Sequence, residues 1–140
     1  MHIIETTFWK TPRAALIVLK ACLDPTPIIT NAKMYALYNK KELISICAIE
    51  KRNNNLELSS VVTKKQYRGK GYATKLLRHV LKKYASLYLV SIPELEHFYK
   101  RFGFRKTAIA PASIYRKVAF VNFFRRLFFQ QPIIVMKRAK

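Results

Sequence analysis

The sequence predicts a single α/β domain with a central mixed, mostly antiparallel sheet and one parallel β-α-β unit. Three observations predict this class. The chain has 140 residues, 51% of them hydrophobic, which is enough for one core and too little for two full domains. Apolar residues alternate at a period of two over 56–63. From residue 71 onward they recur every three or four residues, as in an amphipathic helix.

The N-terminal half is predicted to form one helix and a three-stranded meander. Thr11 before Pro12 is typical of an N-cap followed by the first helical residue, and the apolar pattern continues until Pro25. Short polar turns separate the segments that follow, so we expect them to pair as antiparallel strands. These strands are expected at 34–38, 42–51 and 56–63.

The C-terminal half contains the predicted parallel unit. Its helix begins at Gly71, and the short apolar run 87–90 after it indicates a strand reached by a right-handed crossover. Ser91 and Glu94 match a capping box, which predicts a second helix that stops at Gly103. Two more strands are expected at 104–109 and 132–137, with the basic aromatic segment 113–131 as an insertion between them.

The charge of the chain restricts its partners. It has 27 Lys and Arg against 7 Asp and Glu, a formal charge of +20, and such a surface attracts phosphates, coenzymes, nucleic acid or acidic lipid. Cys22 and Cys47 have no metal-type spacing, so we expect no metal site, and reduced structural thiols in a cytoplasmic protein. The apolar run 14–19 is too short to cross a bilayer, and no transmembrane or export segment is expected.

The turn before the Gly71 helix carries the strongest chemical signal. It reads Gln66-Tyr67-Arg68-Gly69-Lys70-Gly71-Tyr72-Ala73, with further lysines on both sides. Glycines let backbone N–H groups converge on an anion, and a helix N-terminus adds the positive end of its dipole. Thr74 and the spacing exclude both a Walker loop and a dinucleotide fingerprint. The turn therefore predicts a phosphate cradle, and its alternative is a solvated turn in which the glycines only permit tight geometry.

This motif resembles the signature of the GNAT superfamily of acyl-CoA-dependent N-acyltransferases, Gln/Arg-x-x-Gly-x-Gly/Ala. A second block, 98–104, is similar to the family's tyrosine-containing helix end before a Gly-Phe. The resemblance implies a GNAT-like fold for the whole chain, 1–140, and transfer of an acetyl group from acetyl-CoA, the co-substrate, to a primary amine. It also implies a backbone N–H near Val62 that polarises the thioester carbonyl. The coenzyme-binding residues that it implies are Val62, Gln66, Arg68, Gly69, Lys70, Gly71, Tyr72, Ala73 and Thr74.

The resemblance also implies direct attack by the amine, without an enzyme nucleophile. Tyr99 matches the family position that protonates the departing thiolate, a role suited to a phenol, and its alternative is a core aromatic on a helix face. Glu57 is a candidate base that acts on the amine through water, or else a surface carboxylate. Many members carry Asn seven residues before the tyrosine, where this chain has Ile92, which weakens the expectation of a coenzyme contact from that loop.

The charge of the protein also restricts the amine acceptor. A +20 protein with few acids repels polycationic amines, so neutral or anionic amines or protein amino groups are favoured. The alternative function is a non-catalytic basic module that binds nucleic acid or a ribosome.

The segment 113–131 is expected to pack as a helical cover beside the acceptor site, since an interfacial membrane helix would leave a large apolar patch exposed.

Overall fold

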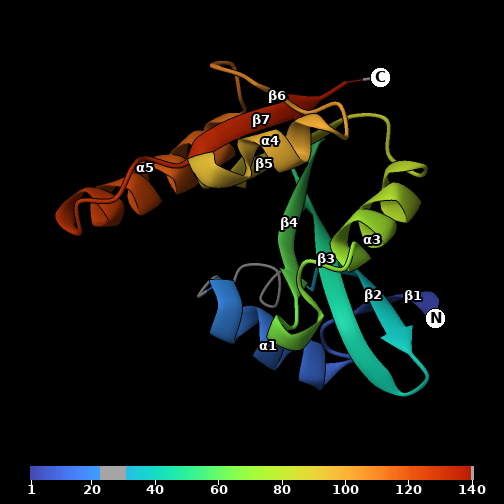
Figure 1. Ribbon diagram of the computed structural model, residues 1–140. Helices are drawn as coiled ribbons and strands as arrows, with labels where there is room; N and C mark the ends of the chain where they lie inside the picture. The colour runs from blue at the N-terminus through green and yellow to red at the C-terminus, as the bar shows by residue number, and fades with distance from the viewer. Residues whose placement is uncertain (23–30, 140) are drawn as a thin grey trace. The chain divides into compact units, whose positions relative to one another are not determined.

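The computed structural model describes residues 1–22 and 31–139, and Figure 1 shows its helices and strands. The fold is α/β with a mixed sheet that is mostly antiparallel and has a parallel pair, as the sequence predicts. The strands are hydrogen-bonded in the order β1-β2-β3-β4-β5-β7-β6. Their bounds are β1 His2–Thr7, β2 Lys33–Asn39, β3 Glu42–Arg52, β4 Asn55–Thr63, β5 Leu87–Ser91, β6 Arg105–Lys106 and β7 Ile134–Arg138. The helices are α1 Pro12–Cys22, α3 Tyr72–Leu81, α4 Glu96–Lys100 and α5 Ala112–Leu127.

The described chain divides into two compact units. The first comprises Met1–Lys51 and Leu58–Tyr84, and the second comprises Arg52–Glu57 and Ala85–Lys140. Strand β4 therefore begins in the second unit and ends in the first. Each unit has its own hydrophobic cluster and is described by itself.

In the first unit, antiparallel β1, β2 and β3 carry the core against α1. The β2–β3 hairpin and α1 confirm the sequence prediction, although Pro25 lies outside the described residues. The core contains Phe8, Ala14, Val18 and Met34, each at most 2% exposed. Cys47 on β3 is also buried, as expected of a structural thiol, and burial raises its pKa. Strand β1 was not predicted, because its hydrogen bonds go to a segment about 30 residues away in the chain rather than across a local turn.

Strand β4 does not follow the simple alternation that its sequence suggests. Three consecutive residues, Glu57, Leu58 and Ser59, are buried. Next to them Ser60 has a φ of 54°, in the left-handed region that side chains other than glycine seldom adopt. A residue of this conformation interrupts the extended backbone, as in a β-bulge, and changes which face the neighbouring side chains meet. Burial along β4 therefore does not follow the period of two that the sequence shows.

In the second unit, β7 pairs antiparallel with both β5 and β6. Its cluster consists of Tyr88, Ile114 and Val135, with Val118 packed against them. The strand expected at 104–109 is only Arg105–Lys106, because Thr107 Oγ1 bonds the backbone of Ile109 and closes a local turn instead.

The capping box expected at Ser91 is absent. Ser91 ends β5, and its hydroxyl donates to the carbonyl oxygen of Ile92 at 3.0 Å rather than accepting from a helix N–H. A 3-10 turn, Pro93–Leu95, then leads into the short helix α4. Gly103 stops this helix as expected, with a φ of 89° and a hydrogen bond from Phe104 N–H to Tyr99 C=O. In the described part of the chain no helix combines the length and apolar character needed to cross a bilayer.

Candidate functional site

The glycine turn of the first unit has the backbone that the motif predicts. A 3-10 turn, Lys65–Tyr67, leads from β4 into it. Gly69 and Gly71 have φ values of 74° and 81°, which any residue with a Cβ would adopt only at a cost in free energy. A Cβ built on either glycine would meet no atom within 4 Å. The glycines are thus required by their backbone angles rather than by crowding, and open space lies next to the turn.

Helix α3 starts directly from this turn, and backbone N–H groups at its start are available to bind an anion. Gly71 is its N-cap and provides no side-chain hydrogen bond, and the first turn contains no acidic residue. The first helical hydrogen bond runs from Lys75 N–H to Gly71 C=O at 3.0 Å. The N–H groups of Tyr72, Ala73 and Thr74 precede it and have no partner inside the helix. Together with the helix dipole they form a donor set that fits a pyrophosphate.

Cationic side chains lie around the turn, and contacts from Arg68 and Tyr67 tie the turn to β4 and β3. Arg68 Nε donates to the carbonyl oxygen of Thr63 at 3.0 Å, and Lys70 Nζ lies 5.8 Å from the centre of the Tyr67 ring. The Tyr67 hydroxyl donates to Glu42 Oε2 at 2.6 Å, and this hydrogen bond is the main cause of a raised pKa of Tyr67. Glu42 thus holds the turn in place from the start of β3, a role that sequence reasoning missed.

The end of β4 is anchored on β3 as well. The hydroxyl of Ser45 donates to the carbonyl oxygen of Val62 at 3.0 Å and lies 2.9 Å from Thr63 Oγ1. Lys64 N–H donates to Ile44 C=O at 3.0 Å. Val62 itself is buried. The strand end that precedes the cradle is therefore positioned by backbone and hydroxyl contacts before any ligand binds.

The two catalytic candidates both belong to the second unit. Tyr99 is 7% exposed on α4, where its ring makes edge contacts with Phe98 and Phe104 at centroid distances of 5.1 and 6.0 Å. This burial fixes the orientation of the ring. It fits a held proton donor and a core aromatic equally well.

Glu57 is buried rather than exposed, so its interpretation as a surface carboxylate is wrong. Its side chain is 1% exposed, and both carboxylate oxygens accept from cations. Arg52 Nε donates to Oε2 at 2.5 Å, and Lys117 Nζ donates to Oε1 at 2.8 Å. Arg52 is across the β3–β4 turn, whereas Lys117 is 60 residues away on α5. No local pattern could have indicated that second partner.

The predicted cradle residues, Val62 and 66–74, thus all belong to the first unit, and Tyr99 and Glu57 belong to the second. A family model described as an acetyltransferase (GNAT) domain matches residues 26–123, which include the cradle and the tyrosine block. No curated protein matches the chain.

Solved structures with this fold have low sequence identity to the chain. A GNAT family acetyltransferase from Elizabethkingia anophelis with acetyl-CoA bound is 18% identical, with a TM-score of 0.73, and 99% of this chain and 98% of that chain are covered. Escherichia coli ElaA is 15% identical, with a TM-score of 0.71 and 99% of each chain covered. N-acetylglutamate synthase from Neisseria gonorrhoeae, complexed with coenzyme A and N-acetyl-glutamate, is 14% identical, with a TM-score of 0.69. The match covers 99% of this chain and 35% of that longer chain. At these identities the structures support the fold, and the family model, which spans more than half of the residues, supports the membership: the chain belongs to the GNAT acetyltransferase family.

Proposed function

We propose that this protein transfers an acetyl group from acetyl-CoA to a primary amine. The observation that carries the proposal is the cradle: two left-handed glycines, three free helix N–H donors and no acid in the first turn of α3. These groups would hold the pyrophosphate of the co-substrate. Gln66, Arg68 and Lys70 are exposed beside them and add hydrogen-bonding and cationic groups.

The chemistry needs few enzyme groups. The amine nitrogen attacks the thioester carbonyl carbon, the C–N bond forms, and the C–S bond breaks with the electron pair going to sulfur. The thiolate then takes a proton, for which we assign Tyr99 as donor on the family's tyrosine motif. A backbone N–H near Val62 would stabilise the negative oxygen during the attack. Glu57 remains the sequence's candidate for deprotonating the amine, although it would have to do so while paired with Arg52 and Lys117.

The charge of the protein supports an acceptor that is not polycationic. With 27 Lys and Arg against 7 Asp and Glu, the protein attracts anionic amines and repels polyamines. Several of the acids are also engaged already, because Glu5, Glu42, Glu57 and Glu96 all form ion pairs with Lys or Arg. Amino acids and other amines with a negative group are the acceptor class that this surface favours.

The test is release of free thiol from acetyl-CoA across a panel of neutral, anionic and polycationic amines, together with calorimetry of coenzyme A binding. Gly71→Glu places a carboxylate at the cradle and should abolish coenzyme binding. Gly71→Ala is the matched control, because it has the same strain at a φ of 81° but no charge, and its Cβ enters open space. Affinity that falls equally in both variants would mean that backbone strain, not an anion site, explains the effect.

A protein that only binds nucleic acid would give a different result. Its affinity for RNA or DNA would fall steeply with salt, and it would release no thiol with any amine. Thiol release that depends on an amine, and is lost in Gly71→Glu, would exclude this alternative as the main function.

A further inference from the structure

Helix α5 has two different apolar faces, one in each half. Successive residues of an α-helix are rotated by about 100°, so residues three or four apart share a face. Ile114, Val118 and Val121 lie on one side of the first half. In the second half the apolar residues follow the spacing i, i+3, i+4, i+7 and i+8, and their mean direction is rotated by roughly 120° from that of the first face. We call these residues the aromatic face: Phe120, Phe123, Phe124, Leu127 and Phe128.

The first half of α5 is packed against its own unit. Ile114 is 0% exposed in a cluster with Tyr88 and Val135, and Val118 packs against that cluster. Lys117 donates to the buried Glu57. These contacts bury Ile114 and Val118 on the apolar side of the first half. They hold the helix on its unit, but the hydrophobic cluster includes none of the residues of the aromatic face.

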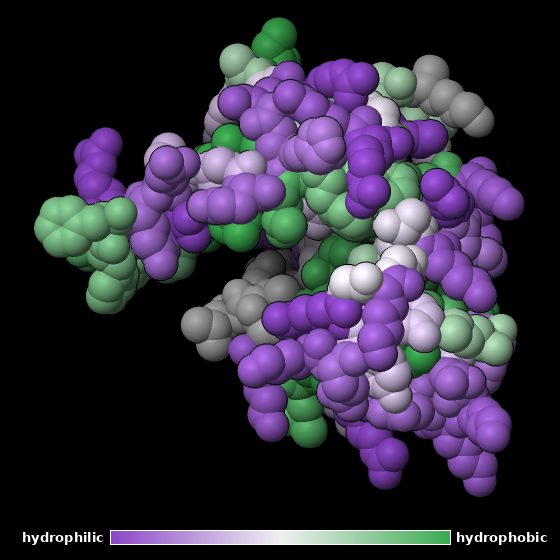
Figure 2. Space-filling view, viewed as in Figure 1, coloured by the Kyte–Doolittle hydropathy of each residue, from purple (hydrophilic) through white to green (hydrophobic). Residues whose placement is uncertain are grey.

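The aromatic face is exposed, contrary to the sequence expectation that 113–131 is buried as a cover. Phe120, Phe123, Leu127 and Phe128 are 59–73% exposed, and Phe124 is 45% exposed. Figure 2 shows apolar atoms at the end of α5, beside strongly hydrophilic ones. The rings of Phe120 and Phe123 each make an edge contact with that of Phe124, at 5.0 and 5.5 Å. These side chains therefore form one contiguous patch, which soluble proteins generally avoid unless the patch binds something.

The chain beyond α5 holds this patch in a fixed position. Asn122 Oδ1 accepts from Ile133 N–H at 2.7 Å, and Arg125 Nε donates to the carbonyl oxygen of Gln131 at 2.6 Å. Phe129 takes the left-handed position after the helix, with a φ of 55°, where glycine is the usual residue, and it is 99% exposed. An aromatic side chain is thus displayed at a position where its backbone is strained.

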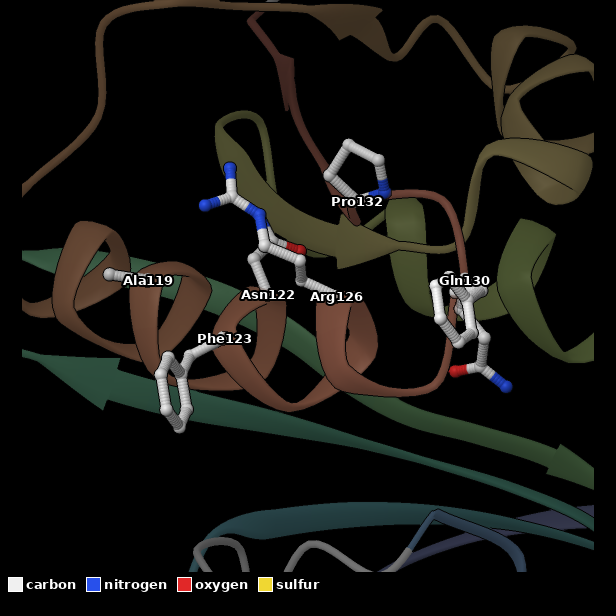
Figure 3. A pocket seen from close by; sticks show the side chains of 7 residues that line it. Ala119, Asn122, Phe123, Arg126, Gln130 and Pro132 are labelled. Carbon is white, nitrogen blue, oxygen red and sulfur yellow. The ribbon is translucent and has the colours of Figure 1, made fainter.

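Exposed arginines of α5 lie beside the aromatic face. Residues 97–140 contain eleven Lys and Arg and no Asp or Glu. Arg116 is exposed on the same side of α5 as the aromatic face, one turn before it. Arg126 lines a hollow of about 630 Å³ together with Asn122, Phe123 and Pro132, which Figure 3 shows from close by. Exposed apolar rings next to exposed arginines, on a helix that has no Asp or Glu of its own, match the two layers of an anionic lipid surface, the acyl boundary and the phosphate headgroups.

Other occupants fit this surface less well. A second copy would bring another chain with a formal charge of +20 against the same acid-free region, and like charges oppose that association. A nucleic acid would meet the arginines, but the centre of the patch is a block of five apolar side chains without a cation among them. We propose that the aromatic face of α5 and the adjacent Phe129, with Arg116 and Arg126 beside them, dock this enzyme on membranes that contain anionic phospholipid.

The test is flotation of the full chain with vesicles, at low and high salt. One set contains equal parts of phosphatidylcholine and phosphatidylserine, and the other contains phosphatidylcholine alone. The double variant Phe120→Ser/Phe128→Ser removes two exposed rings of the aromatic face. Ile109→Ser is the matched control, because Ile109 is 81% exposed in the same unit but lies outside α5. We expect binding to the anionic vesicles only, weakened by at least about tenfold in the double variant and unchanged in the control.

A further variant separates binding from folding. Phe129→Gly relieves the left-handed backbone while it removes a fully exposed ring, so it should weaken vesicle binding without lowering the melting temperature. If the double variant has a lowered melting temperature, vesicle binding of Phe129→Gly tests the proposal instead. The proposal fails if the wild type does not float with anionic vesicles, or floats equally well with vesicles that lack phosphatidylserine. It fails too if Phe129→Gly and the double variant both float with anionic vesicles as well as the wild type does. It also fails if the double variant loses self-association or RNA binding while vesicle binding stays the same.

Discussion

Replacing Glu57 with Gln removes a buried charge that two cations share, and its cost can be worked out from the geometry. The Glu57 side chain is 1% exposed, and those of its partners Arg52 and Lys117 are 17% and 21% exposed. All three are therefore largely shielded from water, so solvent and salt screen the pair only weakly. Breaking such a pair by removing one partner costs about 3–5 kcal/mol, because it leaves uncompensated charge in a poorly solvated place.

We expect the lower end of this range, about 3 kcal/mol, because Gln can still accept one hydrogen bond and both cations keep some contact with water. This is a large part of the total stability of a domain, which is about 5–15 kcal/mol. For a chain of 140 residues it corresponds to a loss of roughly 10 °C in melting temperature. Urea denaturation and thermal melting at neutral pH would measure it.

Glu5→Gln is the matched control within the same chain. Glu5 also accepts from two lysines, Lys33 at 2.9 Å and Lys83 at 3.0 Å, but its side chain is 40% exposed and theirs are 51% and 46% exposed. Exposed pairs contribute about 1 kcal/mol or less. If Glu57→Gln costs no more than Glu5→Gln, burial does not determine the strength of the Glu57 network, and the argument is wrong. The further variant Glu57→Gln/Lys117→Met should regain part of the stability, because it removes one of the two positive charges that face the lost carboxylate.

Two further predictions concern catalysis and acid stability. Tyr99→Phe should retain coenzyme A affinity but slow thiol release, since only the hydroxyl is lost. If the variant and the wild type release thiol at equal rates at every pH, Tyr99 has only a structural role. Hydrogen bonds from Lys33 and then Lys83 lower the pKa of Glu5 to about 2. A depressed folded-state pKa gives stability that is present above the unfolded value and is lost as pH falls, so wild-type stability should decline between about pH 4.5 and 2 more steeply than that of Glu5→Gln. Parallel acid denaturation curves for the two proteins would contradict this assignment.

Features that depend on neighbouring residues could be predicted from the sequence. The glycines of the cradle required positive φ, and Gly69 and Gly71 have it. The apolar spacing after Gly71 indicated the helix that the structure contains, with Leu76, Leu77, Val80 and Leu81 buried. The polar turn between β2 and β3 gave the correct hairpin. In each case a few adjacent backbone angles or one local periodicity fix the result, so no distant contact is needed.

The tertiary structure alone decided the features that depend on distant residues. Glu57 is buried because Lys117, 60 residues later, neutralises it together with Arg52. Val118 and Phe124 are both apolar residues of the segment 113–131, yet Val118 packs on a cluster and Phe124 belongs to the exposed face. A periodicity shows which residues share a side of a helix, but it does not show which side meets another element. That choice rests on burial and charge pairing between segments far apart in the chain, whose free energies appear only when the chain has folded.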